Sequence, residues 1–107
     1  MRILLDSCIP HSFRLQIPGH DVTTAKYAGL DPLTNGALLA AMRGTFDVLV
    51  TCDRSIPRQQ NLSNAAVALI VLRARSNRLQ HLQPLVPELL AELLKIRPGE
   101  VREIDAP

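Results

Sequence analysis

The chain has 107 residues, 47% of them hydrophobic and 21% charged, a composition typical of one globular domain spanning residues 1–107. It contains two Phe, one Tyr and no Trp, so an aromatic platform for stacking nucleic-acid bases is not expected. No apolar run approaches the ~18 residues of a membrane span, and two cysteines make no disulfide framework, so we expect a cytoplasmic protein without a membrane partner.

Strand and helix patterns alternate along the chain. Aliphatic or β-branched runs predict strands, and apolar residues three or four apart predict helices. In chain order, the expected elements are a strand at 3–5, a helix after Pro10, a strand at 21–25, a helix capped by Thr34 or Asn35, strands at 46–51 and 66–72, a helix capped by Ser76 or Asn77, a further helix at about 85–96 and a strand at 101–104. This alternation predicts a three-layer α/β domain, with a mostly parallel sheet of four to five strands between helices.

Polar residues that suit metal chemistry follow three of the predicted strands. Asp6 ends the first strand, Asp53 lies two residues beyond the third, and Asn35 opens the helix after the second. Ligands of parallel α/β sheets bind outside the carboxyl ends of the strands, where Asp6 and Asp53 would meet. Two carboxylates with water and a substrate phosphate suit Mg²⁺, which can activate water for phosphodiester cleavage. The alternative is that each aspartate only forms a turn or caps a helix.

Five arginines and no acid lie between residues 54 and 87. Such a stretch is either a solvated basic face or a rim that contacts phosphates. The polar residues 59–61 within it could line a nucleotide groove or form an ordinary loop. The five arginines are Arg54, Arg58, Arg73, Arg75 and Arg78.

Three further features each leave two interpretations open. Cys8 and Cys52, with His11, could form a soft metal site, although small buried cysteines are the commoner explanation. The leucines between Leu79 and Leu94 predict core positions, and a surplus among them could serve a homodimer or a partner interface. Asp47 should lie near the start of its strand, away from the carboxyl edge.

Several short motifs together resemble a bacterial PIN-like family of small predicted nucleases, which are similar to the toxin halves of toxin–antitoxin pairs. The most specific are L-L-D-S-C-I-P-H-S-F at 4–13, N-G-A-L-L at 35–39, F-D-V-L-V-T-C-D-R at 46–54 and R-A-R-S-N-R at 73–78. The resemblance implies a PIN-like fold, dependence on Mg²⁺ or Mn²⁺, RNA as substrate and an antitoxin protein as a possible partner.

Transferred to this chain, the resemblance makes Asp6 and Asp53 the catalytic metal ligands, with Thr51 in support. Many relatives carry further acids where this chain has Ser7 and the segment 35–37, which reads Asn-Gly-Ala. Ser7 and Asn35 would therefore support the metal without charge, and Asp31, in the loop before Asn35, is the acid that could compensate.

Two functions follow from these residues. The first is a metal-dependent endoribonuclease in which Arg54, Arg73, Arg75 and Arg78 contact phosphates. The second is a catalytically degenerate PIN-like module that binds RNA or an antitoxin. A phosphoacceptor domain of the receiver type is disfavoured, because one acid rather than two follows the first strand and no lysine follows the last.

Overall fold

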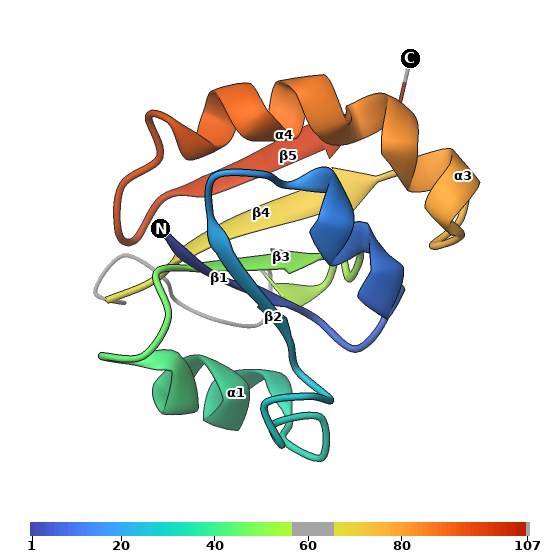
Figure 1. Ribbon diagram of the computed structural model, residues 1–107. Helices are drawn as coiled ribbons and strands as arrows, with labels where there is room; N and C mark the ends of the chain where they lie inside the picture. Colours follow the sequence, from blue (N-terminus) through green and yellow to red (C-terminus); the bar gives the residue numbers. More distant parts are fainter. Residues whose placement is uncertain (57–65, 107) are drawn as a thin grey trace.

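Five short segments pair into one sheet in the computed structural model, which describes residues 1–56 and 66–106 (Figure 1). The sheet order is β2-β1-β3-β4-β5, and every neighbouring pair is parallel. The predicted α/β class is therefore confirmed, with a sheet that is wholly rather than mostly parallel. The strands are β1 (Arg2–Leu5), β2 (Asp21–Thr24), β3 (Val48–Thr51), β4 (Ala68–Arg73) and β5 (Val101–Asp105).

Helices cover both faces of this sheet, as the alternating pattern predicts (Figure 1). One face packs against η1 (His11–Gln16), α3 (Leu79–Leu82), η2 (Gln83–Leu85) and α4 (Val86–Leu93). The opposite face packs against α1 (Asn35–Met42). Because side chains alternate along a strand, Ile3 and Leu5 enter the first core whereas Leu4 enters the second. The result is the expected arrangement of three layers.

Two of the observed elements differ from the prediction, one in its type and one in the residue where it begins. The helix after Pro10 is a 3₁₀-helix that buries Phe13, and Ile17 caps its end. The strand expected at 46–51 begins only at Val48, because the N–H of Phe46 still donates to the carbonyl of Met42 at the end of α1 (2.8 Å). Short 3₁₀ turns and late strand starts of this kind are set by backbone hydrogen bonds that periodicity does not reveal.

The leucines between Leu79 and Leu94 mostly belong to the core, as predicted. Leu82, Leu85, Leu89 and Leu93 are buried against the sheet. Leu94 is 84% exposed at the end of α4, and a single exposed leucine is common on protein surfaces. The homodimer therefore stays a prediction.

The amino edge of the sheet is closed by an ion pair between the first and third strands. Asp47 accepts the backbone N–H of Arg2 (2.7 Å), and its second carboxylate oxygen pairs with the Arg2 guanidinium (3.2 Å). These bonds lower the pKa of Asp47 below its usual 3.8, the side-chain bond from Arg2 being the larger cause. Asp47 thus lies at the edge opposite Asp6, as the sequence predicts. Within the residues described, no helix has the length and apolar character needed to cross a bilayer.

The chain changes direction beside β1, and this fixes where a ligand would bind. From β1 it passes to β2 on one side and then to β3 on the other, so β1 lies between strands reached by opposite turns. Sheets of this order place their ligands at the carboxyl ends of the strands, in the crevice where the order reverses. In this protein that crevice lies between β1 and β3, which end at Leu5 and Thr51.

Candidate functional site

Asp6 occupies the carboxyl end of β1 at this crevice. Its backbone N–H donates to the carbonyl of Val50 (2.9 Å), so the ladder between β1 and β3 extends through Asp6 itself. The carbonyl of Asp6 then accepts the N–H of Ile9 (2.9 Å), which closes a tight turn after the strand. Both bonds hold the backbone of Asp6 rigidly and leave its half-buried carboxylate at the sheet edge.

The hydroxyl of Thr51 connects Asp6 to Asp53. Thr51 is the last residue of β3 and is fully buried. Its Oγ1 donates to Oδ2 of Asp6 (2.7 Å) and accepts the backbone N–H of Asp53 (3.0 Å). One side chain thus fixes the carboxylate that follows β1 and the backbone that carries the second carboxylate. The predicted neighbourhood of Asp6, Thr51 and Asp53 is present in the structure, whereas their chemical role remains a prediction.

Asp53 lies in the turn that follows β3 and is held by its own neighbours. Its Oδ1 accepts both the backbone N–H (2.9 Å) and the hydroxyl (2.5 Å) of Ser55, and Nδ2 of Asn35 donates to its Oδ2 (3.5 Å). These bonds favour the ionised carboxylate and lower the pKa of Asp53 below 3.8, with the Ser55 side chain as the largest cause. Asn35, the first residue of α1, therefore reaches the acidic pair as expected.

The remaining predicted supporters contribute less. Ser7 is exposed, and its backbone N–H donates to Oδ1 of Asp6 (2.8 Å). Asp31 is exposed in the loop ahead of α1, and its carboxylate makes no hydrogen bond or ion pair with any residue that the structure describes. The contacts of the site therefore include Ser7 through its backbone and do not include Asp31.

The predicted arginine rim divides into paired and unpaired members. Arg73, at the end of β4, is ion-paired with Glu103 (2.8 Å) and Asp105 (3.1 Å) of β5, so its charge is already balanced. Arg54 and Arg75 are exposed, and neither forms an ion pair within residues 1–56 and 66–106. Arg78 is exposed as well, ahead of α3. Arg58 and the polar residues 59–61 lie outside the described residues.

Two free thiols lie beside the acidic pair. The backbone N–H of Cys52 donates to Sγ of Cys8 (3.3 Å), and both side chains are half-buried. Interaction with the Cys52 side chain lowers the pKa of Cys8 to about 7, and interaction with Cys8 raises that of Cys52. Thr51 lies 3.6 Å from the Cys8 sulfur, but it has one proton and its shorter bond is to Asp6. Composition alone predicts two buried cysteines and does not reveal this contact.

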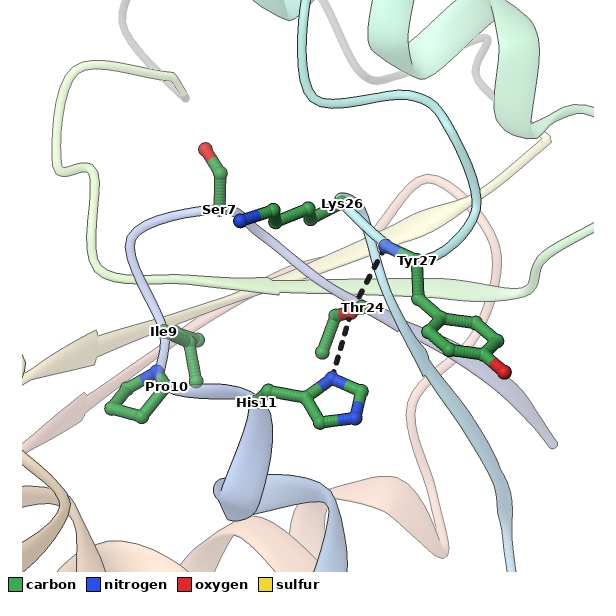
Figure 2. A pocket seen from close by; sticks show the side chains of 7 residues that line it. All are labelled: Ser7, Ile9, Pro10, His11, Thr24, Lys26 and Tyr27. Atoms are coloured by element: carbon green, nitrogen blue, oxygen red, sulfur yellow. Dashed lines mark hydrogen bonds between the residues drawn. The ribbon is translucent and has the colours of Figure 1, made fainter.

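A pocket next to the site was not predicted from the sequence. It is an open cavity of about 700 Å³ between the loops that follow β1 and β2, as Figure 2 shows. His11 lies in it and stacks on Tyr27 (ring centroids 5.8 Å apart), while its Nδ1 is hydrogen-bonded to Oγ1 of Thr24 (3.0 Å). The lining residues are Ser7, Ile9, Pro10, His11, Thr24, Lys26 and Tyr27.

The donor set of the acidic pair suits a hard cation with few protein ligands. A carboxylate offers about four acceptor positions, so Asp6 and Asp53 both keep free positions beyond the bonds they already accept. No group of three His, Cys, Asp or Glu that could hold a metal occurs in the part of the chain described. Mg²⁺ is often bound through one or two carboxylates with waters and substrate phosphates, and Asp6 and Asp53 fit that pattern. The same finding leaves no soft site of Cys8, Cys52 and His11 within those residues.

These features define a class, a parallel α/β domain with two aspartates gathered at the crevice between its first and third strands. Comparison of the chain with models of protein families, with the curated proteins and with the solved structures found no match. The resemblance to PIN-like nucleases therefore remains a prediction from the sequence motifs.

Proposed function

We propose that this protein is a metal-dependent endoribonuclease in which Asp6 and Asp53 form one divalent-cation site. The observation that supports this most is the buried Thr51 hydroxyl, which holds the Asp6 carboxylate and the Asp53 backbone together at 2.7 and 3.0 Å. A fully buried hydroxyl with both bonds made ties the Asp6 carboxylate to the backbone that carries Asp53, at the crevice where such folds bind ligands.

The side chains of the site have separate roles in this proposal. Asp6 and Asp53 present carboxylate oxygens, and the lowered pKa of Asp53 keeps that group ionised at neutral pH. Asn35 and Ser55 orient the Asp53 carboxylate through its two oxygens. Mg²⁺ or Mn²⁺ bound there would polarise the scissile phosphate and lower the pKa of the attacking water.

The substrate phosphates complete the site. Arg54 follows Asp53 directly and is exposed, so its guanidinium is available for a phosphate beside the acidic pair. Arg75 and Arg78 extend the positive charge beyond β4, whereas Arg73 is excluded because Glu103 and Asp105 already bind it. A site of two carboxylates should bind the metal weakly alone and more tightly once a phosphate adds further oxygen ligands.

The cellular context extends the same proposal. The sequence motifs favour a toxin-like nuclease of the bacterial cytoplasm that is restrained by an antitoxin protein. The two free thiols Cys8 and Cys52 agree with a reducing compartment.

Cleavage of a mixed pool of single-stranded RNA tests the proposal. Wild type with Mg²⁺ or Mn²⁺ should cut, and Asp6→Asn and Asp53→Asn should each lower the rate at least 100-fold, because electrostatic stabilisation of a phosphoryl transition state is worth several kcal/mol. Asp21→Asn is the matched control, since this exposed aspartate begins β2 at the opposite edge. Equal rates in all four proteins, or cutting that persists in EDTA, would end the proposal.

A binding module without catalysis is the second candidate, and one observation favours it. In residues 1–56 and 66–106, no third His, Cys, Asp or Glu joins the acidic pair to make a metal-binding group. This candidate predicts that wild type binds RNA or an antitoxin but releases no cleaved RNA at millimolar Mn²⁺. The same cleavage assay therefore separates the two functions.

A further inference from the structure

The pocket beside β1 and β2 contains an aromatic pair that folding does not require. Tyr27 is the single tyrosine of the chain and is 81% exposed. Its ring therefore contributes little to the buried core. It stacks on His11 with 28° between the ring planes, and the two rings come from different segments, His11 from the start of η1 and Tyr27 from the turn after β2. Exposed aromatic rings held in fixed orientations are typical of surfaces that bind planar ligands.

Thr24 fixes both members of this pair. Its Oγ1 accepts the backbone N–H of Tyr27 (3.3 Å) and is hydrogen-bonded to Nδ1 of His11 (3.0 Å), as the dashed lines in Figure 2 show. Thr24 is itself buried at the end of β2, so the two bonds anchor η1 and the turn that carries Tyr27 to the sheet. Nε2 of His11 has no hydrogen-bond partner among the described residues and lies on the side of the ring away from Thr24. It is free to bond a ligand in the pocket.

A cation lines the same pocket. Lys26 is exposed, makes no ion pair with a described residue, and extends toward Ser7 in Figure 2. Ser7 lines the pocket and also donates its backbone N–H to Asp6 (2.8 Å). The pocket spans the gap between β1 and β2, and the acidic pair spans the next gap, between β1 and β3. Neighbouring strands are about 4.8 Å apart, so one nucleotide could bridge the two places.

We propose that this pocket binds the base of one nucleotide of single-stranded RNA against Tyr27 and His11, while Lys26 contacts a phosphate of the same strand. The cavity of about 700 Å³ falls within the range of small-molecule sites, roughly 300–1,000 Å³. The inference rests on the proposed function for the identity of the ligand and adds a base-binding subsite to it. It assigns Tyr27, His11 and Lys26 to the recognition of the RNA strand rather than to the reaction.

Binding of a fluorescent single-stranded oligoribonucleotide, measured by anisotropy in EDTA, tests the subsite without cleavage. Base stacking on an aromatic ring is worth about 1–3 kcal/mol, so Tyr27→Ala should raise the Kd roughly 5- to 150-fold. Tyr27→Phe should stay within about twofold of wild type because it keeps the ring. Leu94→Ala is the matched control, since Leu94 is similarly exposed, at 84%, at the end of α4. Far-UV circular dichroism of each variant verifies that it is folded.

Lys26 and Lys95 are the only lysines of the chain, so a substitution of Lys95 is the control for the same substitution of Lys26. Lys26→Gln should weaken binding and reduce its salt dependence, whereas Lys95→Gln should leave both unchanged. Adenosine monophosphate should compete with the oligonucleotide better than ribose 5-phosphate does, because only the first carries a base.

The outcomes separate this subsite from the nuclease proposal. Equal binding by folded Tyr27→Ala and wild type, or loss of binding in Tyr27→Phe, would overturn the subsite even if cleavage requires Asp6. Binding that depends on Tyr27 in a protein that never cleaves RNA would sustain the subsite and reject the nuclease. No binding by wild type in EDTA, with cleavage present in Mn²⁺, would also overturn the subsite.

Discussion

Replacing Thr51 with valine removes the hydroxyl that connects Asp6 and Asp53 while keeping the shape of the side chain. The variant loses a bond to a charged acceptor (2.7 Å), and bonds of this kind contribute about 1.5–3 kcal/mol. It also leaves the N–H of Asp53 without its acceptor. Water reaches the half-buried Asp6 and the added methyl group offsets part of the loss, so we expect a net destabilisation of about 1–2 kcal/mol. For a domain of this size, that lowers the Tm by roughly 5–15 °C.

Urea unfolding followed by circular dichroism measures this loss, and a double-mutant cycle with Asp6→Asn assigns it to the bond. The coupling between Thr51→Val and Asp6→Asn should be about 1 kcal/mol or more, because the two atoms are in contact. Thr45→Val is the control, since Thr45 is exposed and its side chain makes no hydrogen bond with a described residue. Additive effects, within about 0.5 kcal/mol, would refute the connection through Thr51.

Three further predictions concern other parts of the molecule. Asp47→Asn should lower the free energy of unfolding, measured in urea, by about 1 kcal/mol at pH 7. Because the pKa of Asp47 is lowered in the folded state, this difference between variant and wild type should disappear as the pH falls below about 3.8. A difference that grows in acid would contradict the prediction. Alkylation of Cys8 by iodoacetamide should have its midpoint near pH 7, and Cys52→Ala should move it toward 9; a wild-type midpoint near 9 would reject the thiol contact. Phe13→Ala should lower the free energy of unfolding by about 3–5 kcal/mol, since Phe13 is fully buried. Leu15→Ala should change it by less than about 0.5 kcal/mol, because Leu15 is 71% exposed.

The sequence predicts the centre of the sheet well because β1, β3 and β4 are short and nearly continuous in aliphatic residues. The segment 66–72 predicts a strand covered on both faces, and β4 is indeed buried from Ala68 to Leu72. The same reasoning places Asp6 and Asp53 at one edge and Asp47 at the other, since the carboxyl ends of parallel strands meet at one edge. Edge positions of this kind follow from strand boundaries and direction alone.

Contacts that depend on register or on loop conformation could not be predicted. The pairing of Arg73 with Asp105 follows from β4 and β5 lying side by side with these two residues in register, 32 positions apart in the chain. The sequence treats Arg73 as a free cation because its partners belong to a distant strand. Only the paired strands show that this charge is neutralised.

The aromatic pair was overlooked for a different reason. The expectation that no aromatic platform exists rests on the numbers of Phe, Tyr and Trp. Tyr27 stacks instead on His11, which that count leaves out. The contact joins η1 to the turn after β2, two segments that only the pairing of β1 with β2 brings together. Residue counts therefore give the number of aromatic rings in the chain but do not show which rings lie in contact.

Binding of Mn²⁺, followed by the electron paramagnetic resonance of the free ion, tests most directly whether the two aspartates act as one site. Wild type should bind Mn²⁺ weakly alone and at least tenfold more tightly with a non-cleavable oligoribonucleotide analogue, because phosphate oxygens complete the ligand set. Asp6→Asn and Asp53→Asn should each abolish this gain, and Asp21→Asn should preserve it. Equal Mn²⁺ affinity in wild type, Asp6→Asn and Asp53→Asn, with or without the oligonucleotide, would contradict the shared cation site.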